Sequence, residues 1–395
     1  MRTMQLSPIQ RIAQLGKREI TFFAHRPMLL FCIFVAPILF LCYLTSLMGA
    51  GTPTKLPAAI VDEDDTPTTR SLLRTIDTME GIDFRYRYAS FSEARQAMQQ
   101  GRIYAFIYLP RGTTRDLTSS RQPRISFYVN NCYYVAGAQV MRDLKTGAEL
   151  AGMSATLTTL QARGMTPEQA RAAVQPITIE AHPLGNPTMD YSAFLNNMLI
   201  PGILLLLAML MAIYTLGMEW KKGTQYSWFR QAGESSAIAL IGKLLPQTVV
   251  FTLMMALTHT CFYRYLGFPC RCGLGVMMGW GAFSILAAQG FAVTLFGLMA
   301  GQMRMAMCAC SLWGILSFSL AGLSFPVLAM SPWLQALTWL EPLRHYYLIY
   351  ANQALNGYPI IHVRAHVAVM AAFALSPCLL LRHYRHAILY TRYVP

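Results

Sequence analysis

The stretch YSAFLNNMLIPGILLLLAMLMAIYTLGM at residues 191–218 decides the fold class, because its 28 residues include no Asp, Glu, Lys or Arg. A helix needs about 20 apolar residues to cross the hydrocarbon core of a membrane. Other charge-free runs lie at 27–54, 244–263, 272–303, 305–340 and 365–381. Together the runs predict six transmembrane spans, at about 28–48, 194–217, 240–262, 276–300, 305–328 and 366–382.

Composition supports a membrane protein. Apolar residues make up 54% of the 395 residues, charged residues 13%, and the mean hydropathy is +0.37. A soluble globular chain carries about 25% charged residues. A purely soluble enzyme, a disordered chain and a fibrous repeat are therefore excluded.

The net charge of +14 belongs to the membrane part of the chain. Residues 51–190 hold 15 basic and 14 acidic side chains, whereas the remaining residues hold 17 basic and 4 acidic ones. Basic residues collect on the cytoplasmic side of membrane proteins, where they also attract anionic lipids. The basicity therefore needs no nucleic-acid partner.

The basic residues that flank the spans predict the orientation. They lie before span 1, between spans 2 and 3, between spans 4 and 5, and after span 6: Arg2, Arg11, Lys17, Arg18, Arg26, Lys221, Lys222, Arg230, Lys243, Arg304, Arg382, Arg385 and Arg392. With six spans all four sites fall on one side, which is then cytoplasmic. We expect a multi-pass membrane protein with both termini inside and segment 51–190 outside. Arg264, Arg271, Arg344 and Arg364 remain on the outer side, so the rule holds as a bias.

Residues 1–27 mix apolar and basic positions, which predicts an amphipathic helix in the inner membrane interface. The alternative is an ordinary charged tail. We interpret 28–50 as an uncleaved first span, because its apolar run exceeds the 7–15 residues of a signal-peptide core.

Segment 51–190 alternates strand and helix signals. Strands are predicted at 58–61, 82–88, 103–109 and 125–129, a long helix at about 134–163, a helix from 167 and a return strand at 177–180. The predicted fold class is thus a polytopic α-helical membrane protein, with six transmembrane helices and an inserted extracytoplasmic α/β domain with a helical arm. The acidic run 62–65 lacks the ligand spacing of a calcium loop, so it is interpreted as a helix-starting turn.

Catalytic signatures are absent from the sequence. The nearest approach to a phosphate-binding loop, Gly242-Lys243-Leu244, lacks the first glycine and the hydroxyl. Zinc and nucleophile-elbow signatures are also missing. We therefore predict no catalytic residue, no metal and no cofactor on this chain. The histidines near the last span, His362, His366, His383 and His386, are interpreted as interfacial anchors, with a metal site as the alternative.

Two questions stay open from the residues alone. Cys261 could form a disulfide with Cys270 or Cys272, or all three could be thiols. Glu341, an acid next to an apolar run, is either a functional residue at membrane depth or the partner of Arg344 in a local ion pair.

Several short motifs occur in a consistent order. They are AIVDED at 59–64, SEA at 92–94, GRIYA at 101–105, EWKKGT at 219–224, IGKLLP at 241–246, LSFP at 323–326, MSPWL at 330–334, EPLRHY at 341–346 and NG at 356–357. Their order and their places on the six-span pattern resemble the permeases of ABC-2-type exporters that have a large domain between spans 1 and 2. The resemblance covers nearly the whole chain.

The resemblance implies two functional segments within residues 191–395. The loop 219–236 would be the coupling helix that receives ATPase motion, with Glu219, Trp220, Lys222, Gly223, Thr224, Trp228 and Arg230 as its contact residues. Segment 329–362 would be an outer re-entrant element, and the gate residues would be Phe325, Pro326, Pro332, Trp333, Glu341, Pro342 and Arg344.

The residues of the loop add expectations of their own. We expect Trp220, Tyr226, Trp228 and Phe229 to be exposed, so that the loop is either a membrane-surface anchor or a docking surface for a partner. Glu219 should lie at the surface, where it meets a basic partner or Lys222.

The resemblance also implies the partners. These are separate ABC ATPase subunits that carry ATP and Mg, a second permease chain that is identical or paralogous, a periplasmic adaptor and the lipid bilayer. The alternative functions are a membrane-anchored receptor or scaffold that transports nothing, and an intramembrane enzyme. The sequence does not name the transported substrate.

Overall fold

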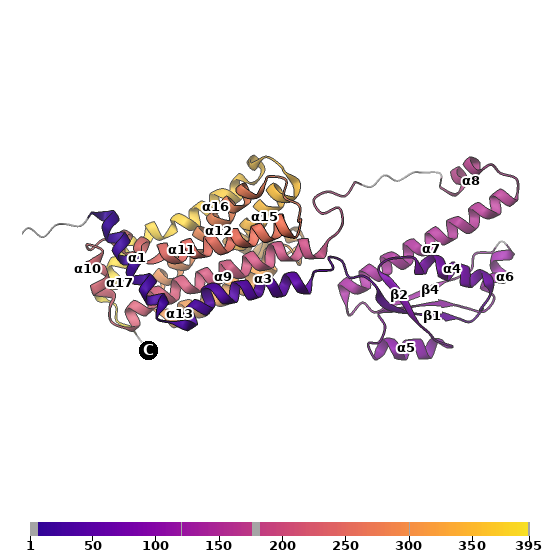
Figure 1. Ribbon diagram of the computed structural model, residues 1–395, viewed down its shortest axis with the longest axis horizontal. Coiled ribbons are helices and arrows are strands. Elements are labelled where there is room, and N and C mark those ends of the chain that lie inside the picture. The colour runs from indigo at the N-terminus through magenta and orange to yellow at the C-terminus, as the bar shows by residue number, and fades with distance from the viewer. Residues whose placement is uncertain (1–6, 120, 176–181, 300, 394–395) are drawn as a thin grey trace, which may run out of the picture. The chain divides into compact units, whose positions relative to one another are not determined.

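The structure is a computed structural model that describes residues 7–119, 121–175, 182–299 and 301–393. The chain divides into two compact units. The helical unit comprises Met1–Gly49 and Pro183–Pro395, and the α/β unit comprises Ala50–His182. Figure 1 shows both units with their elements labelled.

The helical unit contains the six predicted membrane helices. By length and composition, candidate spans cover Pro27–Leu47, Tyr191–Lys221, Ser236–Tyr265, Leu274–Leu298, Met303–Leu320 and Ile360–Tyr390 in the described part of the chain. The prediction of six such helices is confirmed. The fifth ends before residue 328 because Gly322 adopts a left-handed φ of +94°.

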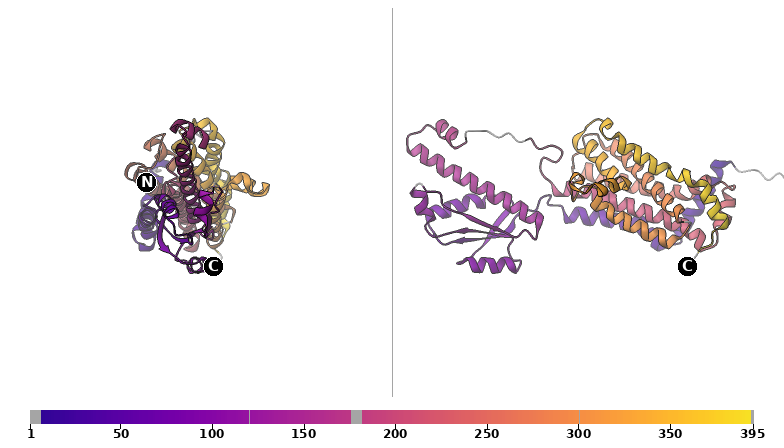
Figure 2. Two further views of the ribbon diagram at one scale, coloured as in Figure 1. Left: turned by 90° about the vertical axis from the view of Figure 1, so that its right-hand side faces the viewer. Right: turned by 180° about the vertical axis from the view of Figure 1, so that it is seen from behind.

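The principal helices are α1 (Pro8–Ala24), α2 (Pro27–Leu30), α3 (Ala36–Leu47), α9 (Tyr191–Lys221), α10 (Gln225–Gln231), α11 (Ser236–Thr260), α12 (Leu274–Leu298), α13 (Met303–Leu320), α14 (Pro332–Leu337), α15 (Pro342–Tyr350), α16 (Arg364–Leu375) and α17 (Leu381–Tyr390). Helix α9 packs against α11, α12 and α13, so it forms the centre of the unit. The right-hand view of Figure 2 shows these helices side by side.

Small residues allow the long helices to approach closely. A Cβ atom on Gly202 of α9 would lie 2.6 Å from Phe318 Cε1 in α13. A Cβ atom on Gly290 of α12 would lie 2.1 Å from the carbonyl oxygen of Phe373 in α16. Both distances are too short for a side chain, as expected where membrane helices pack backbone to backbone.

Helix α1 lies along α11 and coincides with the predicted interfacial helix. It begins with a capping box between Ser7 and Gln10, and Pro8 occupies its first turn. The contact with α11 is close, because a Cβ atom on Gly242 would lie 2.7 Å from Leu15 Cβ. One face of α1 is buried, whereas Ile9 and Ile20 are exposed.

The α/β unit is built on a four-stranded sheet. Its strands are β1 (Leu56–Asp62), β2 (Ile82–Arg87), β3 (Ala105–Leu109) and β4 (Ser126–Val129), in the order β2-β1-β3-β4. Strand β1 pairs in parallel with β2 and β3, and β4 pairs antiparallel with β3. The predicted return strand at 177–180 lies outside the described residues.

Helices cover both faces of this sheet. The covering helices are α4 (Pro67–Asp77), α5 (Phe91–Gln99) and α7 (Tyr134–Ala162), while α6 (Thr113–Thr118) contacts α4 and α8 (Pro167–Val174) contacts α7. Figure 1 shows α4 and α7 on one side of the sheet and α5 on the other. Alternate residues of β1 follow this division: Ile60 packs in the core under α4 and α7, and Val61 packs in the core under α5.

The acidic run at 62–65 stabilises turns. Asp62 Oδ1 accepts hydrogen bonds from the backbone N–H groups of Asp64 and Asp65. Asp64 accepts hydrogen bonds from the backbone N–H groups of Gly112 and Thr114. Hydrogen bonds from Thr114 and Gly112 lower the pKa of Asp64 below its usual value. These carboxylates therefore hold the loops after β1 and β3 together.

Candidate functional site

Four charged side chains meet inside the helical unit, beside the predicted coupling loop. Lys243 Nζ lies 2.6 Å from Glu19 Oε1 and 2.7 Å from Glu219 Oε1. Arg18 Nη2 lies 2.8 Å from both carboxylate oxygens of Glu219. Lys243, Glu19 and Glu219 are only 1%, 2% and 4% exposed. We call these four residues the charge cluster. Two acids and two bases make the cluster neutral, the condition under which buried charges are tolerated.

The cluster joins four segments that are distant in sequence. Arg18 and Glu19 belong to α1, Glu219 lies in the last turn of α9, and Lys243 belongs to α11. The turn before α10 is attached as well, because Thr224 Oγ1 donates a hydrogen bond of 2.5 Å to Glu219 Oε2. The cluster therefore links α1 and the start of α10 to two candidate spans.

Gly223 shapes the turn between α9 and α10. Its φ is +67°, the left-handed conformation that commonly ends a helix. The following backbone N–H, that of Thr224, donates to the carbonyl of Glu219 at 2.9 Å. A Cβ atom on Gly223 would meet nothing within 4 Å. The backbone conformation, rather than lack of space, thus favours glycine here.

The expectation that Glu219 lies at the surface, with a basic partner or Lys222, is wrong. Glu219 is buried, and its partners are Arg18, Lys243 and Thr224. Lys222 is exposed, and its Nζ lies 5.1 Å from the centre of the Phe22 ring. The physical reason is the packing of α1 and α11 against the end of α9, which supplies better partners than a neighbour in sequence.

The expected exposure of the loop aromatics is also wrong, except at Tyr226. Trp220, Trp228 and Phe229 are buried. The ring of Trp220 packs edge-on against Trp228 and against Phe296 of α12, with centroid distances of 6.3 Å and 5.4 Å. These rings anchor α10 to the bundle, and they are worth more to stability than to docking.

The outward face of α10 is polar with one aromatic ring. Tyr226 is 51% exposed, and Ser227 and Arg230 are exposed as well. Tyr and Arg are enriched among the residues that carry binding energy at protein interfaces. The exposed face of α10 therefore offers a small docking surface on a helix that lies next to the charge cluster, since the ring centre of Trp228 in α10 is 5.6 Å from Lys243 Nζ.

Sequence reasoning missed Glu19 and its neighbour Arg18 as site residues. A signal was present, because Glu19 is the only acidic residue before Asp62. Burial raises the pKa of Glu19 above its usual value, and the nearby Lys243 ammonium opposes that rise. Glu19 therefore depends on Lys243 to remain charged.

The end of the helical unit opposite α10 contains a second buried acid. Glu341 is fully buried, and it accepts a hydrogen bond from the Ser317 hydroxyl of α13. Arg344 does not pair with it. Instead, Arg344 Nη1 donates to the carbonyl of Ala321 at 3.4 Å. The predicted Glu341–Arg344 ion pair is therefore wrong. The alternative, that Glu341 is a functional residue, stays a prediction.

The other predicted gate residues lie in short elements of the same region. Phe325 and Trp333 are exposed, by 53% and 67%. Pro332 and Pro342 occupy the first positions of α14 and α15, where their fixed φ suits a helix start. Pro326 precedes a single 3₁₀ turn, Val327–Ala329. The structure thus gives the prolines local roles, and it does not gather the gate residues into one pocket.

His345 is a further residue that sequence reasoning missed. Its Nδ1 lies 2.9 Å from His366 Nδ1, and its Nε2 lies 2.9 Å from the carbonyl oxygen of Trp339. His366 also stacks on the Trp339 ring at 5.1 Å. His366 therefore joins α16 to α15, in addition to any anchoring role at the interface.

Metal and disulfide chemistry find no support here. Within residues 7–119, 121–175, 182–299 and 301–393, no group of three or more His, Cys, Asp or Glu side chains could hold a metal ion. All nine cysteines are free thiols in the structure, including Cys261, Cys270 and Cys272.

Comparison with known proteins identifies the family. The profile of the family described as "ABC-2 family transporter protein" matches residues 27–380, which include all six candidate spans almost entirely. A search of curated proteins gave no significant match. Glu219, Lys243, the α10 turn and Glu341 lie within the matched range, whereas Arg18 and Glu19 precede it. The chain therefore belongs to the ABC-2 family of transporter proteins and is a multi-pass membrane permease of the type that associates with ABC ATPase subunits.

Proposed function

We propose that this chain is the permease subunit of an ATP-driven exporter, and that the motion of a separate ATPase subunit enters it through α10 and the charge cluster. Family membership supports the permease role and the association with ATPase subunits. The export direction follows from the family resemblance noted in the sequence. ATP and Mg would be held by the partner, and this chain would hold no cofactor.

The charge cluster is the observation that carries the proposal. Removing one partner from a buried ion pair costs about 3–5 kcal/mol, because the other charge is left buried without compensation. The segments that share the pair therefore resist any displacement that would separate the charges while they stay buried. The cluster ties α1, the end of α9 and the start of α11 to one another, and Thr224 adds the α10 turn. A push on α10 would therefore move the cytoplasmic ends of two spans as one body.

The orientation supports this arrangement. The basic flanks of the spans place α10 in the cytoplasm, where an ATPase subunit can reach it. The α/β unit, inserted between α3 and α9, would lie outside the bacterial inner membrane. Two permease chains, identical or paralogous, would enclose the path, and the outer segment with Phe325 and Trp333 would form its gate. A periplasmic adaptor is a further proposed partner.

Coupling can be tested on the exposed face of α10. Arg230→Glu reverses a charge at an exposed position, and such surface changes typically alter stability by less than about 0.5 kcal/mol. We expect normal expression but a loss of permease-stimulated ATP hydrolysis in the reconstituted complex. Arg304→Glu, at another exposed position on the same proposed cytoplasmic side, in the first turn of α13, is the matched control and should leave stimulation unchanged.

Two results would contradict the proposal. If Arg230→Glu keeps full stimulation while Arg304→Glu also does, α10 is not the docking site. If the purified chain hydrolyses ATP without a partner after stringent repurification, the assignment of ATP hydrolysis to a separate subunit is wrong. A receptor or scaffold, the alternative function, would show neither stimulated hydrolysis nor substrate accumulation in cells that lack the protein.

A further inference from the structure

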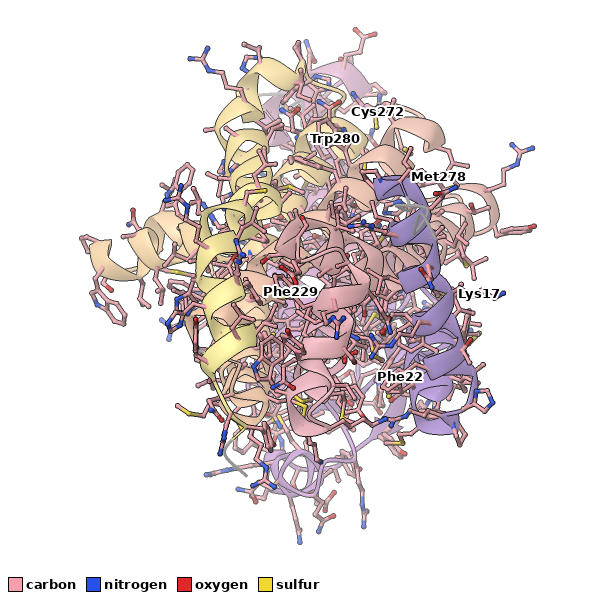
Figure 3. The ribbon with its side chains drawn as sticks, turned by 90° about the vertical axis from the view of Figure 1, so that its left-hand side faces the viewer. Lys17, Phe22, Phe229, Cys272, Met278 and Trp280 are labelled. Carbon is pink, nitrogen blue, oxygen red and sulfur yellow. The ribbon has the colours of Figure 1, made fainter. Side chains whose placement is uncertain are left out.

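A cationic cavity lies beside the charge cluster, on the side of α1 that faces the end of α9. It has a volume of about 470 Å³, and its walls include Arg18, Phe22, Arg26, Glu219 and Lys222. Figure 3 shows Phe22 on the bundle side of α1, whereas Lys17 projects away from the bundle. The cavity is separate from the exposed face of α10, which carries the proposed docking role.

The cations in this cavity outnumber the anions. Glu219 is already neutralised within the charge cluster, by Arg18 and Lys243. Arg26 and Lys222 have no carboxylate partner among the described residues. Both cations lie over the same ring: Arg26 Cζ is 4.1 Å and Lys222 Nζ is 5.1 Å from the centre of Phe22. Two uncompensated cations held this close favour an anion between them.

Arg18, which lines the cavity, also carries a hydrogen-bond donor without a partner among the described residues. Arg18 Nη2 donates to both oxygens of Glu219, but the buried Arg18 Nη1 has no partner among the described residues. A guanidinium presents its donors in a fixed fork that suits phosphate oxygens. An anion in the cavity could therefore use Nη1 without disturbing the contact with Glu219.

The depth of the cavity favours a lipid over a soluble anion. Arg26 immediately precedes the candidate span Pro27–Leu47, and Lys222 immediately follows the candidate span Tyr191–Lys221. Both cations thus stand at the same boundary of the hydrocarbon core, where phospholipid phosphates lie. Basic pockets between helices on the cytoplasmic side commonly bind anionic head groups.

We propose that this cavity binds the phosphate head group of an anionic phospholipid from the inner leaflet, between Arg18, Arg26 and Lys222. The bound lipid connects α1 to the end of α9 through the phosphate, in parallel with the charge cluster. The choice of leaflet rests on the proposed orientation, but the binding itself does not require transport. A failure of lipid binding is therefore distinguishable from a failure of the exporter assignment.

The test measures lipid binding to the purified full chain in neutral detergent by native mass spectrometry. Phosphatidylglycerol is titrated as the anionic probe, and phosphatidylcholine as the neutral one. Arg26→Gln and Lys222→Gln should each weaken phosphatidylglycerol binding about fivefold, the effect of one basic side chain near an anionic surface. Binding of phosphatidylcholine should not change. Higher salt should weaken the binding of phosphatidylglycerol to the wild-type chain more than its binding to the variants.

Matched variants keep the test decisive. Arg304→Gln removes an exposed cytoplasmic cation outside the cavity and should bind both lipids as the wild type does. Arg26→Lys keeps the charge and should retain most binding. Tyr214→Phe removes the hydroxyl to which Arg26 donates at 3.1 Å, so it controls for loss of that contact.

Three outcomes would overturn the assignment. Equal losses in Arg304→Gln and Arg26→Gln would indicate general surface attraction. Full competition by glycerol phosphate at equal concentration would identify a site for a soluble phosphate. Unchanged lipid binding in Arg26→Gln and Lys222→Gln, together with loss of complex formation with the ATPase subunit, would assign the cavity to a carboxylate of the partner protein.

Discussion

The two ends of the helical unit each bury an acid, but they treat it differently. At the end that carries α10, Glu219 receives Lys243, Arg18 and Thr224 as partners. At the opposite end, Glu341 has one hydrogen bond, from Ser317, and its Oε1 has no partner among the described residues. A neutralised acid holds helices together, whereas a poorly satisfied acid costs stability and is retained where a role compensates for it. The comparison favours a structural role for the charge cluster and a functional role for Glu341.

The largest expected effect on stability comes from disrupting the charge cluster. Glu219→Ala leaves Arg18 without its acid and Lys243 with only Glu19, so we expect a loss of about 3–5 kcal/mol in stability. The sequence alone, which places Glu219 at the surface, would predict near-normal expression for this variant. Fluorescence-detected size exclusion of the detergent-solubilised chain and its thermal midpoint measure the effect.

A paired substitution separates charge balance from packing. In Glu219→Ala/Arg18→Met one acid and one base are removed, and the remaining pair, Lys243 and Glu19, keeps its contact of 2.6 Å. This variant should regain part of the lost stability. A double variant that is no more stable than Glu219→Ala would show that the cluster does not act through its charge balance.

The turn that carries Thr224 should be the next most sensitive position. Gly223→Val places a β-branched side chain at a φ of +67°, which costs about 1–3 kcal/mol of backbone strain. Coupled ATP hydrolysis should fall with it. Gly223→Asn, which tolerates left-handed backbone, is the control and should remain close to the wild type in both stability and coupling.

Glu341 should respond in the opposite sense. Glu341→Gln removes a buried acid that lacks a cationic partner but keeps a similar shape, so thermal stability should stay within about 1 kcal/mol of the wild type or rise. Transport should fall if Glu341 acts at the gate. A loss of stability as large as that of Glu219→Ala would remove the contrast between the two ends.

The smallest effect is expected in the α/β unit, where Asp64 is a solvent-accessible acid. Its lowered pKa means that Asp64 stabilises the fold above the pKa of the unfolded chain, and that this contribution is lost as pH falls through the folded pKa. Hydrogen exchange of the amides of Gly112 and Thr114 in the full chain should therefore become less protected in acid. In Asp64→Asn these amides should be less protected at neutral pH and should lose the acid dependence.

Those contrasts also show what the sequence could predict. The spans are predictable because about 20 apolar residues are needed to cross a bilayer, and the strands of the α/β unit because short apolar runs, such as 58–61, and the alternation of residues at 82–88 are visible in the sequence. Both signals are local in the chain. The single acid at Glu19, in a basic segment, could also have been recognised as a residue that needs a partner.

The partners themselves could not be predicted. Glu219 pairs with residues 201 positions before it and 24 positions after it, and no local period encodes that choice. The burial of Trp220 depends in the same way on Phe296 of α12. A residue pattern gives the face of a helix, but not the helix that covers it. The errors in the sequence-based site are therefore errors about tertiary contacts.

The span of the charge cluster along the chain has a consequence for biosynthesis. Glu19 leaves the ribosome 224 residues before Lys243. At roughly 5–20 residues per second, the delay is roughly 10–45 s. Throughout that interval the first span is in the membrane while Glu19 and Arg18 lack their final partners, and the head-group region must solvate them. The charge cluster is complete only after the third span, which carries Lys243, has been inserted. A nascent chain truncated before Lys243 should therefore bind α1 weakly, and it should be degraded early by membrane quality control.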